Sequence, residues 1–198
     1  VLEEYQRPAE ANRIFTDLLA KLPEIPSIGT RREVLLAAAR NAAHQKEFTI
    51  AAERFSQLAK LGPLDDKTLD EYAGVLVQAD RADEAARLLE QSPSSARALK
   101  LLASIYASQK RFHEAIGVYQ RLLKESPGDL PALRGLADNE LWSRDFTAAA
   151  AQYRAILAQN PSDLEARAQL AEALLAGHYY EQALAEYTAL LDRLPDRP

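Results

Sequence analysis

A spacing of 34 residues recurs along most of this chain and constrains its fold more than any other feature. Alanine returns at this interval, with one shorter step of 30 residues, in two parallel sets. The first set is Ala51, Ala85, Ala115, Ala149 and Ala183. The second set is Ala39, Ala73, Ala103, Ala137 and Ala171. A fixed period of about 20–50 residues indicates a repeat architecture, in which each unit buries its apolar face only by stacking on its neighbours.

Large residues keep the same register, so the alanine spacing is not a chance match in an alanine-rich chain. Four residues after each alanine of the first set stand Phe55, Leu89, Tyr119, Tyr153 and Tyr187. Twelve residues after it, in the units of full length, stand Pro63, Pro127, Pro161 and Pro195. Good helix formers dominate and glycine is scarce, which favours helices over strands. Each unit is therefore predicted to hold two helices, the second ended by proline.

This pattern resembles the tetratricopeptide repeat family, whose 34-residue unit is a pair of antiparallel helices. The unit that begins at Ala96 carries the family's residues in register, at Leu99, Leu102, Ala103, Tyr106, Ala115, Tyr119 and Pro127. The resemblance implies an all-α fold, a right-handed α-α superhelix of five helix-turn-helix repeats plus a partial N-terminal repeat.

The register divides the chain into a partial repeat and five full ones. Residues 1–31 are assigned to the second helix of a partial repeat and a linker, in which residues 24–30 form a longer joint. The repeats are assigned to residues 32–65, 66–95, 96–129, 130–163 and 164–198. The second repeat is four residues short, about one helical turn, so its second helix is predicted to be short. With no methionine in the chain, we expect it to be a fragment of a larger protein.

Five polar residues stand where the register gives them a structural role. Asp129 is predicted to cap the helix that follows it, and Ser162 with Glu165 is predicted to form a capping box. Glu140 and Arg167 fall at positions that the repeat normally fills with apolar residues. Because a buried charge is costly unless it is paired, we expect these two side chains to reach outward, with a specific pairing between repeats as the alternative.

Several function classes find no support. The net charge of -5 argues against a general nucleic-acid binder, and the absence of cysteine excludes disulfides and thiolate metal sites. No apolar run is long enough for a membrane span. The histidines, His44, His113 and His178, lack metal-ligand spacing, and no glycine-rich phosphate loop occurs. We therefore predict no enzyme, no catalytic residue, no metal and no cofactor, although a carboxylate pair that acts on a glycan stays an alternative.

The candidate binding residues follow from the resemblance, which implies that the first helix of each repeat lines a concave face. On that face stand Arg97, Lys100, Arg134, Asp138 and Trp142. The three cations would form a basic patch that holds a carboxylate or acidic segment, with the tryptophan as an aromatic anchor. The alternative is an ordinary solvated helix face of mixed charge.

We therefore predict a non-catalytic scaffold that binds a partner protein or peptide in the concave groove. A second hypothesis comes from a looser resemblance to the periplasmic tetratricopeptide regions of bacterial exopolysaccharide export proteins. That resemblance implies a scaffold in the bacterial periplasm or cell envelope that docks polysaccharide-assembly proteins, such as a polymer-modifying enzyme or a synthase.

Overall fold

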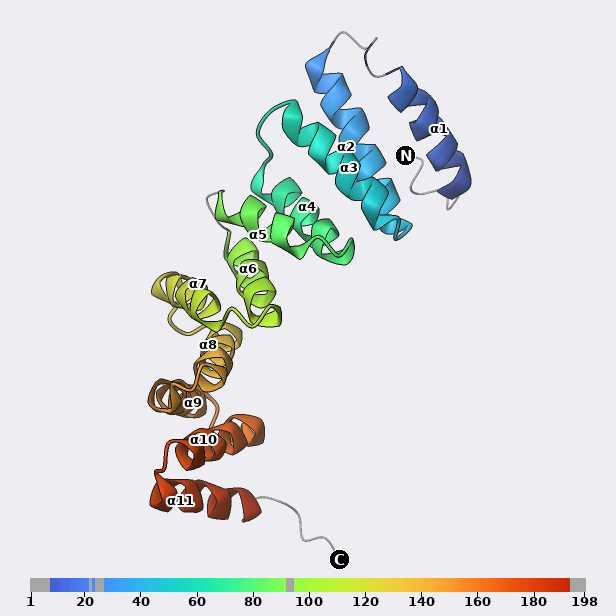
Figure 1. The fold of residues 1–198 in the computed structure, drawn as a ribbon. Helices are drawn as coiled ribbons and strands as arrows, with labels where there is room; N and C mark the ends of the chain where they lie inside the picture. The colour runs from blue at the N-terminus through green and yellow to red at the C-terminus, as the bar shows by residue number, and fades with distance from the viewer. Residues whose placement is uncertain (1–7, 22, 24–26, 92–94, 193–198) are drawn as a thin grey trace, which may run out of the picture. The chain divides into compact units, whose positions relative to one another are not determined.

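The computed structural model describes residues 8–21, 23, 27–91 and 95–192, and side chains from residue 14 onward. Within these ranges the chain forms eleven α-helices and no strand (Figure 1). The helices are α1 (Pro8–Ala20), α2 (Ile28–His44), α3 (Phe48–Lys60), α4 (Asp66–Gln78), α5 (Ala82–Glu90), α6 (Ala96–Ser108), α7 (Phe112–Glu125), α8 (Leu130–Trp142), α9 (Phe146–Gln159), α10 (Leu164–Ala176) and α11 (Tyr180–Leu191). They form two compact units, Val1–Ser95 and Ala96–Pro198.

Consecutive helices pack against one another within each unit. In the first unit α1 packs on α2, α2 on α3, α3 on α4 and α4 on α5. In the second unit the hairpins are α6 with α7, α8 with α9 and α10 with α11, and α7 also packs on α8 as α9 does on α10 (Figure 1). This is the stacked arrangement of helix pairs that the 34-residue period predicts.

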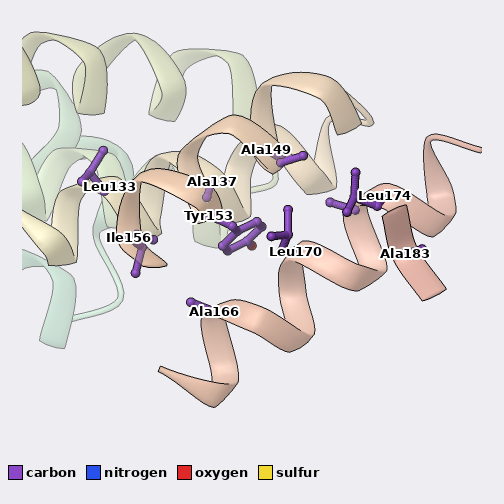
Figure 2. Packing of buried hydrophobic residues seen from close by; sticks show 11 residues of the cluster. Leu133, Ala137, Ala149, Tyr153, Ile156, Ala166, Leu170, Leu174 and Ala183 are labelled. Carbon is purple, nitrogen blue, oxygen red and sulfur yellow. The ribbon is translucent and has the colours of Figure 1, made fainter. Parts of the chain in front are cut away.

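The recurring alanines lie where the two helices of a pair meet. All ten are buried, with nine of them 0% exposed and Ala183 2% exposed. Larger side chains fill the space around them, as Tyr153 does beside Leu170 in the core of the second unit (Figure 2). Since a methyl group is the largest side chain that such close helix packing admits, the alanine period sets the distance between the helices.

The turn inside each hairpin has one shape in all five repeats. It holds a non-glycine residue in the left-handed region, with φ between 59° and 70°: Lys46, Asp80, Lys110, Arg144 and His178. In the third repeat the amides of Lys110 and Arg111 donate to the carbonyl groups of Ala107 and Tyr106, at 3.0 and 2.8 Å. These bonds satisfy the last carbonyls of the first helix and reverse the chain within three residues.

Aspartates cap two first helices of the second unit, α8 and α10. The Asp129 carboxylate accepts from the Ala132 amide at 3.1 Å, which confirms the predicted cap. The predicted capping box at Ser162 and Glu165 is wrong, because Asp163 caps α10 and the Ser162 hydroxyl instead donates to Asn160. A carboxylate one residue nearer to the helix reaches the free amide first.

The shortened repeat and the N-terminal joint follow the local sequence. Helix α5 has nine residues, where the other second helices from α3 to α11 have 12 to 14. The last residues of the expected joint are helical, because α2 begins at Ile28 with Ser27 as its cap. The Thr30 amide donates to the Ser27 hydroxyl at 3.3 Å.

Candidate binding face on the first helices of the second unit

The five candidate residues all lie in the second unit, on α6 and α8. We call the surface that they form with Asp129, Asp163 and Glu165 the first-helix face. Arg97 and Lys100 lie on α6, and Arg134, Asp138 and Trp142 follow at four-residue steps along one side of α8. Residues four apart share a helix face, so the repeat presents them together.

Lys100 is held by the aspartate that caps the first helix of the next repeat. Its ammonium lies 2.7 Å from Asp129 Oδ2, while Asp129 Oδ1 accepts from the Ala132 amide. Lys100 and then that amide hold the pKa of the Asp129 carboxyl below its usual value, against the opposing effect of burial. One carboxylate therefore caps α8 and also neutralises a cation on α6.

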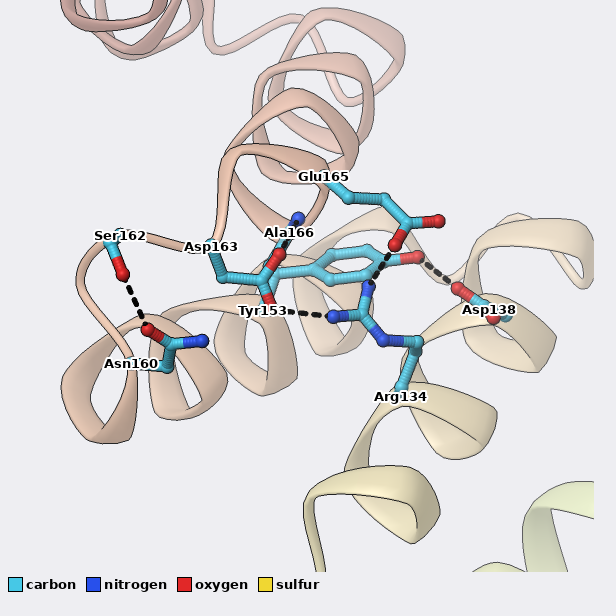
Figure 3. Close-up of polar contacts among 8 residues, drawn as sticks. All are labelled: Arg134, Asp138, Tyr153, Asn160, Ser162, Asp163, Glu165 and Ala166. Carbon is cyan, nitrogen blue, oxygen red and sulfur yellow. Dashed lines mark hydrogen bonds and ion pairs between the residues drawn. The ribbon is translucent and has the colours of Figure 1, made fainter. Parts of the chain in front are cut away.

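The same arrangement returns one repeat later. Arg134 Nη2 lies 2.6 Å from Asp163 Oδ2, and Asp163 Oδ1 accepts from the Ala166 amide at 2.9 Å (Figure 3). Arg134 Nη1 also lies 3.5 Å from Glu165, whose side chain is 75% exposed. Two of the three predicted cations are thus paired within the array, and Arg97 is exposed at the start of α6.

The sequence contains a pattern that indicates these two ion pairs, but it is visible only when the charged residues are compared between repeats. Asp129 and Asp163 are 34 residues apart, as Lys100 and Arg134 are, so a cation and an aspartate recur in step. A search for binding residues within the first helices omits Asp129 and Asp163, because each stands just before its helix begins.

Asp138 is hydrogen-bonded to a tyrosine of the hydrophobic core. The Tyr153 hydroxyl donates to Asp138 Oδ1 at 2.6 Å, and the Tyr153 side chain is fully buried (Figure 3). Burial raises the pKa of Asp138, while the hydrogen bond from Tyr153 and the charge of Arg134 oppose that rise. Burial also raises the pKa of Tyr153, and so does the bond to Asp138. Asp138 therefore presents a half-buried carboxylate whose position the tyrosine fixes.

Trp142 is the exposed aromatic residue of this face. Its side chain is 54% exposed, although its ring centre lies 5.7 Å from that of Phe112 at an angle of 45°. One part of the indole is therefore supported by α7, and the rest faces solvent. A large ring held in place and half exposed is well suited to contact a partner, because little side-chain freedom is left to lose.

Glu140 and Arg167 do not reach outward, so the expectation for them is wrong. Glu140 is 4% exposed, and its Oε2 atom has no hydrogen-bond partner among the described residues. Burial foremost, with the nearby charge of Asp145, raises the pKa of Glu140 to about 7. Arg167 is largely buried and lies 2.7 Å from Glu186, which pairs α10 with α11 inside one repeat.

Metal ligation and membrane insertion find no support in the described part of the chain. It brings no three histidine, aspartate or glutamate side chains together as metal ligands. Among the same residues, no helix combines the length and apolar character that crossing a bilayer takes.

Comparison with known proteins agrees with this geometry. The sequence matches the family model of the tetratricopeptide repeat over residues 73–129 and 134–198, together more than half of the chain. No curated protein sequence matches it. Among solved structures, a MamA protein superposes with a TM-score of 0.71 at 16% identity, over 84% of this chain and 98% of that one. MamA from Desulfovibrio magneticus RS-1 gives a TM-score of 0.69 at 12% identity, over 84% and 96%.

A third structure similar to this chain is YrrB, described as a tetratricopeptide repeat protein with an unusual peptide-binding site. It superposes with a TM-score of 0.70 at 16% identity, over 92% of this chain and 93% of that one. At these identities the superpositions show a shared fold of stacked helix pairs.

Proposed function

Because this chain belongs to the tetratricopeptide repeat family, we propose that it is a non-catalytic scaffold that binds a partner protein or peptide on the first-helix face. The observation that carries the proposal is Trp142, a large aromatic side chain that α7 supports and that is 54% exposed. It stands on the same side of α8 as Arg134 and Asp138, so an apolar anchor and fixed charges are offered together. Aromatic residues and arginine are the residue types that most often dominate binding energy.

The paired cations still have donors to offer. Lysine has three N–H donors and arginine five, and the pairs with Asp129, Asp163 and Glu165 use only some of them. The Lys100 side chain is 42% exposed and that of Arg134 is 30% exposed. The aspartates hold both cations in place before a partner arrives, which lowers the entropy lost on binding. With Arg97, they would hold a partner carboxylate about two helical turns from Trp142 along the face.

The test is capture of a partner from lysate of the native source, with variants that respect the aspartates. Charge reversal at Lys100 or Arg134 would place a glutamate against a capping aspartate and disturb the helix start. We therefore choose Trp142→Ala and the neutral pair Lys100→Gln/Arg134→Gln. The matched control is Arg121→Gln/Lys124→Gln, which removes two exposed cations from the second helix α7.

The proposal expects a partner that the wild-type chain and the α7 control capture, and that both face variants lose. Circular dichroism checks that all four proteins are equally helical. A partner held equally by all of them would place binding away from this face. The envelope hypothesis adds a narrower expectation, that the captured partner comes from the periplasmic or envelope fraction and is a protein of polysaccharide assembly. A partner found only in the cytoplasmic fraction would contradict that part.

A further inference from the structure

One oxygen of the Asp138 carboxylate is not used by any described residue. The Oδ1 atom accepts from the Tyr153 hydroxyl at 2.6 Å, whereas the Oδ2 atom has no hydrogen-bond partner among the residues that the structure describes (Figure 3). Because the Tyr153 side chain is fully buried, this hydrogen bond fixes the position of the carboxylate. Asp138 therefore holds a fixed acceptor that a ligand can use.

The hydroxyl of Tyr119 lies close to Asp138 and has no hydrogen-bond partner in the described part of the chain either. The Tyr119 ring lies against Gly135, which precedes Asp138 by three residues on α8. Burial foremost, and then the charge of Asp138, raises the pKa of Tyr119, as expected of two groups that are close together. Two polar side chains with unused hydrogen-bonding capacity are thus neighbours on the first-helix face.

Trp142 follows Asp138 by one helical turn. The two residues are four apart on α8, so their β-carbons lie about 5–6 Å from each other. The face of an indole attracts a cation, and the flat guanidinium group of arginine stacks on it more often than the ammonium of lysine does. A guanidinium group on the exposed part of this indole would have N–H groups within reach of Asp138.

The charges around these residues favour a positively charged ligand. The carboxylates of this part of the face are Asp138, Asp163, Glu165 and Glu172. Arg134 stands among them and is already bound to Asp163 and Glu165, at 2.6 and 3.5 Å (Figure 3). The other arginine of α8 and α10, Arg167, is largely buried and bound to Glu186 on α11. This end of the face therefore attracts positive charge.

We infer that the first-helix face binds an arginine side chain of its partner between Asp138 and Trp142, with the guanidinium group stacked on the indole and donating to Asp138 Oδ2. The inference rests on the proposed function and narrows it, because it adds a basic residue to the acidic group expected at Arg134. Along α8 the two positions lie about 9 Å apart, which is about three residues of an extended chain. The partner segment would thus carry an acidic residue and an arginine at that separation.

Trp142 is the single tryptophan of the chain, so tryptophan fluorescence reports on this position directly. The probe is an acetylated and amidated peptide with aspartate first, arginine fourth and alanines between them. Its matched control has citrulline in place of arginine, which keeps the shape of the side chain and removes the charge. Each peptide is titrated into the whole chain in three forms: wild type, Asp138→Asn, and Glu125→Gln, which removes an exposed carboxylate at the end of α7.

The arginine peptide should change the Trp142 fluorescence saturably and should bind at least about fivefold more tightly than the citrulline peptide at low salt. Asp138→Asn keeps an acceptor for the Tyr153 hydroxyl but loses the charge, so it should lose most of this preference. Glu125→Gln should retain the preference. The comparison of the two peptides on the wild-type chain needs no variant, so it tests the inference even where Asp138→Asn fails to fold.

Three results would overturn the inference: equal binding of the two peptides, no saturable change up to about 5 mM arginine peptide, or a preference that a folded Asp138→Asn variant retains. None of them decides the proposed function, which would stand if a partner captured from lysate were lost in Trp142→Ala. Conversely, an arginine preference in a chain that captures no partner would support the inference and count against the proposed function.

Discussion

The ring of Tyr119 occupies the space beside Gly135 that a β-carbon would need. Tyr119 lies on α7 and Gly135 on α8, so the missing side chain of one helix accommodates the aromatic ring of its neighbour. Glycine inside a helix costs about 1 kcal/mol relative to alanine, and here the fit of the ring offsets that cost.

Gly135→Ala should therefore destabilise the chain by about 1–2 kcal/mol, despite the better helix propensity of alanine. Gly117→Ala is the matched control, because a β-carbon at Gly117 meets nothing within 4 Å. That variant should stabilise by about 0.5–1 kcal/mol. Urea unfolding followed by circular dichroism measures both, and Tyr119→Ala should remove the penalty of Gly135→Ala. Equal stabilisation by both alanines would show that Tyr119 moves aside at no cost.

The double role of Asp129 gives a graded series. Asp129→Ala loses the cap and the ion pair and should cost about 1–2 kcal/mol, whereas Asp129→Asn keeps a good cap and should cost under about 1 kcal/mol. Ser162→Ala should be close to neutral, because that hydroxyl does not cap α10. Unfolding in urea ranks the three variants, and a larger loss for Ser162→Ala than for Asp129→Ala would contradict this assignment.

The pH dependence of the cap has a defined sign. Lys100 and the Ala132 amide lower the pKa of Asp129 below its ordinary value of 3.8. The stabilisation is therefore fully present only well above 3.8, and it is lost as the pH falls from there through the lower folded-state pKa. Asp129→Asn should remove this part of the acid sensitivity.

Glu140 gives the opposite pH dependence. Its folded-state pKa of about 7 lies above the ordinary 4.5, so the folded chain binds the proton more tightly than the unfolded chain. The free energy of unfolding should fall by about 3 kcal/mol as the pH rises from 4.5 to above 7. Glu140→Gln should flatten this slope and be more stable than wild type at pH 8. The exposed Glu125 offers the control, since Glu125→Gln should leave the slope as it is. An unchanged slope in Glu140→Gln would show that another group causes it.

The positive φ angles in the hairpin turns predict where a glycine would stabilise the fold. Lys110 has φ 59°, a conformation that a side chain disfavours by about 1 kcal/mol and that glycine adopts freely. Lys110→Gly should raise the free energy of unfolding by up to about 1 kcal/mol, and Lys110→Val should lower it. Lys124→Gly, in the last turn of α7, should destabilise by about 1 kcal/mol. The thermal midpoints of the three variants order the effects.

The period fixed in the sequence was enough to predict the packing, because burial in a repeat depends on position within the unit. That is why Ala103 and Ala137, 34 residues apart, are both 0% exposed. The polar contacts could not be predicted in the same way, because the repeat period does not give the distances between side chains. The register predicts an open basic patch at Lys100 and Arg134, whereas each of them pairs with an aspartate that stands just before the next first helix.

Glu140 shows the other limit of sequence reasoning. A glutamate can extend its carboxyl to solvent from many partly buried positions, so outward reach was the reasonable expectation. The outcome depends on how closely α8 and α9 pack around that one residue, and no spacing in the sequence encodes this.

The aspartates that start α8 and α10 also bear on how the array responds to a ligand. Each carboxylate is shared between an amide of the helix that it caps and a cation on the preceding first helix, so a partner that draws Lys100 or Arg134 away leaves the carboxylate bonded to the amide alone. In the proposed mode of binding, occupancy of one first helix would thereby reach the first turn of the next. Hydrogen–deuterium exchange at the amides of Ala132 and Ala166 would therefore report whether a partner is bound to the preceding first helix.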